Sequence, residues 1–195
     1  ARLLEWLAAH ERALTIRLVK GAYWDAEVAQ ASRNHWSVPV HAEKAETDLA
    51  FERLTRTLLS AHPLVTTAIA SHNVRSIAHA MATAELLGLP SDGLEFQLLY
   101  GMGESLQPAI TERGYPVRIY TPIGELVPGM AYLVRRILEN TANESFLRQD
   151  WFSERSADAL LRPPTAADAS PVAVTDPGWA AEPLGNFALA STRDQ

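Results

Sequence analysis

Residues 65–100 decide the fold of this chain: VTTAIASHNVRSIAHAMATAELLGLPSDGLEFQLLY. Two apolar runs with the length of buried strands, Val65 to Ala70 and Leu94 to Tyr100, enclose this stretch. Between them, apolar residues recur at helical spacing until Gly88: Val74, Ile77, Ala78 and Met81. A strand, a helix and a strand in this order predict parallel strands joined by a crossover helix.

The same alternation continues on both sides. Upstream, the pattern predicts a helix from Arg2 to Leu14, a strand from Ile16 to Val19 and a helix that carries Ala50, Phe51, Leu54 and Leu58 and stops before Pro63. Downstream, it predicts a loop at 101–103, a helix from Glu104 to Arg113, a strand from Val117 to Tyr120 and a long helix from about Pro128 to Asn140. The predicted class is α/β with four strand–helix units.

Four such units are half of a (β/α)8 barrel, and full barrels need about 250 residues. The units occupy only residues 1–150, so we expect either an open sheet or a half-barrel with its partner half outside this chain. Residues 151–195 form a second segment, rich in Ala and Pro with little periodicity, which predicts an irregular linker or arm.

Composition excludes several classes of protein. The chain has 195 residues, 47% hydrophobic and 21% charged, as expected for a folded domain. Its net charge of -6 is not the positive charge typical of nucleic-acid-binding proteins. It has no cysteine, which removes disulfides and thiolate zinc sites and is compatible with the cytoplasm. No apolar run could span a membrane, so membrane contact is at most peripheral. We expect no metal site, since His41 and Glu43 are isolated, and no P-loop, Rossmann or zincin motif occurs.

Polar residues follow each predicted strand, where active sites of parallel α/β proteins gather. They are Lys20, Tyr23, Trp24 and Asp25, then Ser71 to Asn73, Tyr100 to Glu104, and Tyr120 to Glu125. Within the strands, Arg17, Gln97 and Arg118 interrupt apolar runs, and a buried arginine must be paired or meet an anionic or polar ligand. An ion pair between Arg17 and Glu95 and a ligand contact are both open.

The last predicted helix has two faces. Met130, Leu133, Val134, Ile137 and Leu138 form a core stripe, which leaves Tyr132, Arg135, Arg136, Glu139 and Asn143 on the other side. Adjacent guanidinium groups beside a tyrosine suit capture of a small carboxylate, although a solvated face fits the same pattern.

Lys20 has two further interpretations. A lysine at the end of a barrel strand can form a Schiff base, which gives a lyase or aldolase hypothesis. The Lys20-Gly21-Ala22 string also places backbone N–H groups beside a cation, which suits a phosphate or pyrophosphate. A third possibility is a non-catalytic half-barrel that associates with another chain through its strand edges.

Five strings resemble the proline dehydrogenase family, above all the proline dehydrogenase domain of the bifunctional proline utilization A proteins. They are RLVKGAYWD at 17–25, ASHN at 70–73, EFQLLYGMGE at 95–104, RIYTPIGE at 118–125 and AYLVRRILENTANESF at 131–146. The resemblance covers roughly residues 1–150, in order.

The resemblance implies a fold and an activity. This chain would be the C-terminal half, strands 5 to 8 and the final helix, of a distorted (β/α)8 barrel that binds FAD. That enzyme oxidises L-proline to Δ1-pyrroline-5-carboxylate and passes electrons to a quinone, in the cytoplasm or at the inner face of the membrane. The chain would then be a fragment that needs the N-terminal barrel half, with residues 151–195 leading toward a fused aldehyde dehydrogenase domain.

The resemblance also implies roles for individual residues. Arg17 would lie near the flavin N5 and tune its redox state, and Arg17 and Tyr23 would be the catalytic residues. The cofactor-binding residues would be Arg17, Val19, Lys20, Gly21, Ala22, Trp24, Ser71, His72, Gln97 and Phe146. Ser71 stands where the family more often has Thr. The proline carboxylate would bind Arg135 and Arg136, supported by Glu139, and Tyr23, Leu99, Tyr120 and Tyr132 would enclose the ring.

Overall fold

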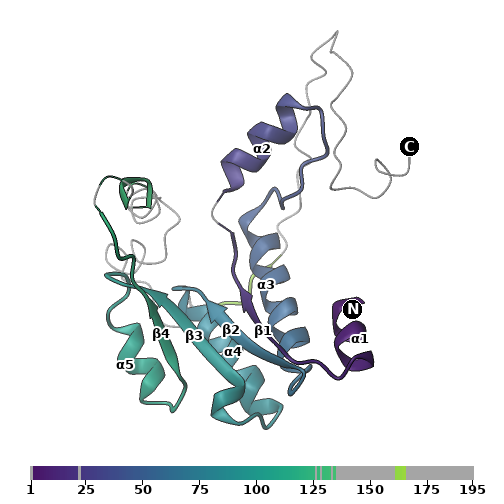
Figure 1. The fold of residues 1–195 in the computed structure, drawn as a ribbon, viewed down its shortest axis with the longest axis vertical. Helices are drawn as coiled ribbons and strands as arrows, with labels where there is room; N and C mark the ends of the chain where they lie inside the picture. The colour runs from purple at the N-terminus through teal and green to yellow at the C-terminus, as the bar shows by residue number, and fades with distance from the viewer. Residues whose placement is uncertain are drawn as a thin grey trace.

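The computed structural model describes residues 2–21, 23–125, 127, 129–132, 134 and 161–165. Along the chain the elements are α1 (Arg2–Ala9), β1 (Leu14–Leu18), α2 (Trp24–Arg33), α3 (Lys44–Leu59), β2 (Val65–Ala70), α4 (Val74–Leu86), the 3-10 helix η1 (Ser91–Gly93), β3 (Leu94–Leu99), α5 (Leu106–Thr111) and β4 (Val117–Tyr120). Figure 1 shows the four strands side by side, with α2 projecting away from the sheet.

The four strands form one parallel sheet in the order β1-β2-β3-β4, as the alternating pattern predicts. Each strand is hydrogen-bonded to the next along the chain, with Arg17 opposite Ala68, Ala68 opposite Glu95, and Gln97 opposite Arg118. Sequential parallel neighbours are the arrangement that a partial barrel has. The carboxyl ends of all four strands therefore lie along one edge.

Several boundaries differ from the sequence prediction: β1 lies two residues earlier at its start, β3 ends one residue earlier, and α5 is shorter at both ends. The first helix ends at Ala9 rather than Leu14, because Glu11 takes a positive φ of 51° that no helix tolerates and Leu14 begins β1 by donating its N–H to the Leu64 carbonyl. The sequence also gave no sign of α2, whose single buried residue is Ala31. A helix without an apolar stripe lacks the periodic signal.

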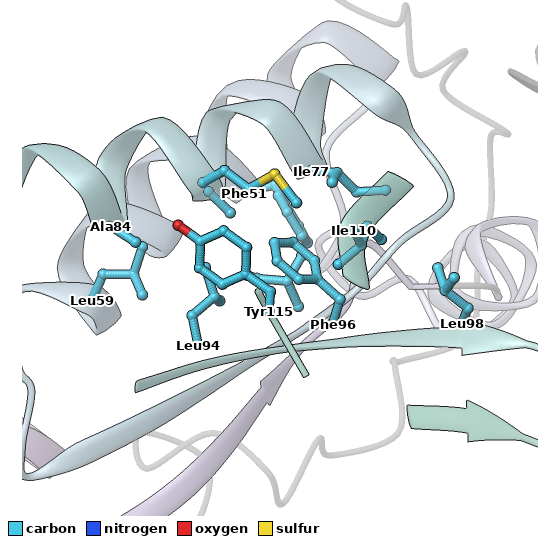
Figure 2. Close-up of a cluster of buried hydrophobic side chains, with 12 residues drawn as sticks. Phe51, Leu59, Ile77, Ala84, Leu94, Phe96, Leu98, Ile110 and Tyr115 are labelled. Carbon is cyan, nitrogen blue, oxygen red and sulfur yellow. The ribbon is translucent and has the colours of Figure 1, made fainter. Parts of the chain in front are cut away.

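One face of the sheet carries the main core. Side chains of β2 and β3 pack against α3, α4 and α5, and Figure 2 shows the labelled residues filling the space between helices and sheet. The Phe96 ring is fully buried and meets the Tyr115 ring edge to face, with centroids 5.6 Å apart. On α4, Ile77, Ala80, Met81 and Ala84 supply the inward stripe, and the Asn73 side chain caps the helix by accepting from the Ser76 N–H at 2.9 Å.

The opposite face is largely uncovered by the described residues. Arg17 and Arg118 lie on it and are exposed, so the expectation of buried arginines is wrong. On the same face Glu95, Gln97 and Ala70 are partly buried and Ala68 is fully buried. Of the two possibilities left open for Arg17, the ion pair with Glu95 does not form, because Glu95 pairs with Arg118 on the adjacent strand.

The last predicted helix, residues 128–140, lies mostly outside the described residues, although positions 129–132 and 134 are helical. Of the arm, only residues 161–165 are described. Among the described helices, none is long and apolar enough to cross a membrane.

Candidate functional site

The carboxyl edge of the sheet gathers the polar residues that the sequence placed after each strand. Lys20 follows β1, Ser71 and His72 follow β2, and Leu99 ends β3 beside Tyr120 on β4. Because the strands are parallel and adjacent, residues up to 100 positions apart in the chain reach one edge. Ala22, Arg135, Arg136, Glu139 and Phe146 lie outside the described residues.

Lys20 is held by a three-residue charge network. Its Nζ donates to Asp48 Oδ1 at 2.6 Å, while Lys44 Nζ donates to Asp48 Oδ2 at 2.6 Å. The Lys20 ammonium also lies 5.2 Å from the centroid of the Phe51 ring. The sequence prediction named Lys20 but missed Asp48, which sits on the first turns of α3.

In this network, burial and ion pairing have opposite effects on the pKa values of Lys20 and Asp48. Burial lowers the pKa of Lys20 below its usual value, while the hydrogen bond and charge of Asp48 act in the other direction. Burial acts to raise the pKa of Asp48, but the hydrogen bonds from Lys20 and Lys44 outweigh it and hold that pKa below its usual value. Asp48 is therefore a carboxylate at neutral pH, and the geometry favours a charged Lys20 beside it.

His72 is fixed by the backbone around it. Its Nε2 accepts the N–H of Leu99 at 3.0 Å, so a neutral His72 carries its proton on Nδ1. Gly103 lies against the same ring: a Cβ there would stand 3.6 Å from His72 Cδ2 and 2.9 Å from Leu106 Cδ1, at a φ of 58°. The neighbouring Ser71 Oγ accepts the Asn73 N–H at 3.1 Å. These contacts orient the Ser71-His72 pair at the end of β2.

The open face of the sheet carries a second charge network. Arg118 reaches both carboxylate oxygens of Glu95 at 2.8 and 2.7 Å, and the Gln97 amide donates to Glu95 Oε1 at 2.7 Å. The hydrogen bond from Arg118 lowers the pKa of Glu95 below its usual value. Arg17 shares this face, is exposed, and makes no ion pair within the described residues.

The aromatic residues divide between two places. Tyr120 and Tyr132 come together with ring centroids 5.9 Å apart and a tilt of 47° between the ring planes. Trp24 lies elsewhere, because its Nε1 donates to the His41 carbonyl at 2.8 Å and holds the side chain at the connection between α2 and α3. Tyr23 and Val19 are about half exposed, at 56% and 48%.

A cavity of about 130 Å³ lies beside Lys20, on the helix side of the carboxyl edge. Its wall includes Lys20, Asp48, Glu52, Arg75, Arg162 and Pro164. Sequence reasoning missed Glu52 and Arg75, although one signal existed: Glu52 adjoins Phe51 in a helix whose buried positions are otherwise apolar or Thr. A carboxylate on such a face requires a cationic partner, and Arg75 supplies it at 2.8 Å.

No group of three or more histidine, aspartate or glutamate residues stands close enough to hold a metal ion in the part of the chain that the structure describes. The site offers cations, amides, a hydroxyl and aromatic rings instead. Those groups are suited to binding an anionic, partly aromatic organic molecule.

Comparison with known proteins gives a consistent result. The family model for proline dehydrogenase matches residues 1–149. The bifunctional protein PutA of Escherichia coli (strain K12) is 36% identical over 172 residues, which is 85% of this chain and 13% of that protein. Proline dehydrogenase 2 of Bacillus subtilis (strain 168) is 35% identical over 67% of this chain and 39% of its own length.

Solved structures agree with the sequence matches. Proline utilization A from Bdellovibrio bacteriovorus, inactivated by N-propargylglycine, superposes with a TM-score of 0.90 at 45% identity, covering 99% of this chain and 20% of that one. Proline utilization A from Corynebacterium freiburgense gives a TM-score of 0.70 at 28% identity, over 99% of this chain. This chain thus spans between about one eighth and two fifths of the relatives named here, and it belongs to the proline dehydrogenase family.

Proposed function

We propose that this chain is the FAD-binding and substrate-binding half of a proline dehydrogenase. In this proposal it supplies strands 5 to 8 and the final helix of a distorted (β/α)8 barrel that oxidises L-proline to Δ1-pyrroline-5-carboxylate and passes electrons to a quinone. Family membership supports the reaction. The observation that carries the assignment of this half is the uncovered sheet face, which holds Arg17 and Gln97 beside the Lys20, Ser71 and His72 edge.

The uncovered face has the dimensions and chemistry for a flat ring system. Ala68 and Ala70 put small side chains on β2, between Arg17 on one side and Glu95 and Gln97 on the other. In the proposal a planar flavin approaches the sheet at Ala70, which is only partly buried, rather than at the fully buried Ala68, while polar groups reach its edges. Gly21 adds access at the end of β1, because it has a φ of 88° and nothing stands within 4 Å of where a Cβ would be.

When bound, FAD accepts the hydride that L-proline loses, so the protein's task is to position both molecules and shape the electrostatics. Arg17, unpaired within the described residues, can donate hydrogen bonds to the edge of the flavin. His72, oriented by the N–H of Leu99 at its Nε2, lies at the edge where the proposal places the flavin. Lys20 presents its positive charge to the phosphate side, steadied by Asp48.

Substrate recognition falls to the strand ends and the last helix. In the proposal, Tyr120 and Tyr132, whose rings are tilted against one another, form one side of the site for the proline ring, beside Leu99 on the adjacent strand. In the proposal, Arg135 and Arg136 bind the proline carboxylate with support from Glu139, Phe146 and Ala22 join the flavin contacts, and Tyr23 completes the ring enclosure. Trp24 would need to leave its hydrogen bond with His41 to join the cofactor contacts around Lys20.

The proposed organisation has two parts. Residues 1–150 are the barrel part, and residues 151–195 are an arm toward a fused aldehyde dehydrogenase domain. The PutA relatives, named as bifunctional proteins, support the second assignment. Electron transfer to a quinone requires only peripheral contact with a membrane.

The Schiff-base alternative, with Lys20 as nucleophile, is less consistent with the geometry. A lysine attacks a carbonyl only when it is neutral, and Asp48 at 2.6 Å stabilises the protonated form. Sodium borohydride trapping with carbonyl substrates tests it directly. A covalent adduct on Lys20 would favour the lyase, and absence of an adduct is expected here.

The deciding experiment measures flavin retention and reduction. The chain is purified with excess FAD, alone and together with the N-terminal barrel half of a PutA relative, and free cofactor is removed before anaerobic addition of L-proline. We expect retained flavin whose absorbance near 450 nm bleaches when the two halves are combined. Bleaching by this chain alone would mean that it assembles a complete site, for instance as an oligomer.

An Arg17→Met variant provides the matched test of the uncovered face. Because Arg17 is exposed, the variant is expected to fold like the wild type and to lose most of the bleaching rate. The exposed Arg113, in the turn after α5, gives the control, since Arg113→Gln should have no effect. Retained flavin with an unchanged bleaching rate in Arg17→Met would contradict the role given to this face.

A further inference from the structure

Residues 161–165 return to the domain after the region that matches the family. Arg75 on α4 holds them, because its Nη1 donates to the Leu161 carbonyl at 2.7 Å while its Nε donates to Glu52 Oε1 at 2.8 Å. One guanidinium thus connects α3, α4 and the returning segment. The Arg75 pKa is raised by the hydrogen bond to Glu52, so this connection is charged at all ordinary pH values.

The docked segment completes the wall of the cavity beside Lys20. Arg162 and Pro164 close the side that α3 and α4 leave open. The cavity measures about 130 Å³, and a water molecule takes about 30 Å³ of liquid volume. It therefore has room for a phosphate-sized group but not for a whole dinucleotide.

Charge in and around this cavity is unbalanced. Lys20 and Asp48 neutralise one another, as do Arg75 and Glu52, but Arg162 has no carboxylate partner within the described residues. Lys44, which does not line the cavity, forms a second ion pair with Asp48 and brings a further positive charge near the cavity. His79 also touches Glu52, at 3.6 Å, but burial lowers its pKa and it contributes a neutral ring at pH 7. The cavity lining therefore has a net positive charge, which favours the binding of an anion.

We propose that Arg162 binds a phosphate group in this cavity and that Arg75 positions the 161–165 segment for it. The inference rests on the proposed function, because the diphosphate of FAD is the phosphate that this function brings to Lys20. Inorganic phosphate or another nucleotide would present the same chemistry. The segment after the family-matched region would then be a working part of the ligand site rather than a linker alone.

Binding measurements on the full chain, combined with the N-terminal barrel half of a PutA relative, test the proposal without using activity. FAD, ADP, inorganic phosphate and riboflavin, which has no phosphate, are titrated by calorimetry into the wild type, Arg162→Gln, Arg162→Lys and Arg113→Gln. We expect Arg162→Gln to weaken FAD and ADP binding by about tenfold, the loss of one charge-assisted contact. Riboflavin binding stays unchanged, Arg162→Lys retains most of the affinity, and Arg113→Gln matches the wild type.

The outcomes separate this inference from the proposed function. Equal affinity of wild type and Arg162→Gln for FAD, ADP and phosphate would overturn the inference alone. Arg162-dependent binding of inorganic phosphate by a chain that binds no flavin would support the phosphate site and overturn the FAD assignment. A wild-type chain that binds none of the four compounds would overturn both.

Arg75→Lys tests the positioning step. Lysine preserves the charge opposite Glu52, but its single nitrogen cannot replace the two separate guanidinium nitrogens that reach Glu52 and the Leu161 carbonyl. We expect faster hydrogen exchange at 161–165 and ADP binding weakened as in Arg162→Gln, with exchange in the α3 and α4 core unchanged. Wild-type exchange at 161–165 and wild-type ADP affinity in this variant would show that Arg75 does not position the segment.

Discussion

The two faces of the sheet are built from alternate residues of the same strands, yet they differ in almost every property. On the helix side, Phe96 and Leu98 are buried among apolar side chains. On the other side, Glu95 and Gln97 belong to a polar network with an exposed Arg118. Since neighbouring residues point in opposite directions, a single strand can place a stabilising side chain and a ligand-binding one next to each other. Stability and function are thus separated by face rather than by region of sequence.

The largest expected effect is on the helix side. Phe96→Ala removes a fully buried ring that contacts Tyr115, and we expect a loss of about 3–5 kcal/mol in the free energy of unfolding. Urea denaturation followed by circular dichroism measures it. Gln97→Ala, one residue away on the other face, serves as the control and should cost less than about 1 kcal/mol. Equal losses in the two variants would contradict the separation of faces.

Asp48→Asn should have an intermediate effect, because it leaves the partly buried Lys20 ammonium without its carboxylate. We expect about 1–3 kcal/mol of destabilisation in urea denaturation. Lys44→Gln removes only the more exposed of the two lysine partners and should cost less. A larger loss from Lys44→Gln than from Asp48→Asn would show that the buried pair is not the important one.

The same pair predicts a pH dependence. The folded-state pKa of Asp48 lies below its ordinary value of 3.8, so its contribution to stability is present above that value and is lost as the pH falls through the lowered pKa. The difference in unfolding free energy between wild type and Asp48→Asn should therefore narrow below about pH 3.8. A constant difference from pH 7 to pH 2 would contradict this assignment.

Glu95→Gln should have the smallest effect on stability. Its partner Arg118 keeps 69% of its side chain exposed, and solvent screens such a pair. We expect no measurable change in the urea midpoint, together with weaker retention of FAD when this chain is combined with its barrel partner. A marked fall in the urea midpoint with unchanged FAD retention would show that Glu95 stabilises the fold and does not contribute to FAD binding.

Much of the site could be predicted from local sequence because the signals are short. A five- or six-residue apolar run followed by polar residues identifies both a strand and its carboxyl end, so Lys20, Ser71, His72 and Tyr120 could be placed at that edge, while their roles there stay predictions. Asp48, Glu52 and Arg75 were missed, because their importance comes from helices that bring partners 23 to 28 residues apart into contact. Trp24 was placed with the cofactor residues on its position in a motif, while a hydrogen bond to His41 holds it elsewhere.

The sequence by itself determined the α/β class, the four strands and the family, because apolar periodicity and short motifs are local properties of the chain. Only the tertiary structure decided which carboxylate each cation meets. Arg17 and Arg118 both occupy strand positions that face the same side of the sheet. Glu95 pairs with Arg118 because the two lie on adjacent strands, whereas β2 separates Glu95 from Arg17. Register and helix packing set those distances, and an ion pair forms only where they bring the charges within about 4 Å.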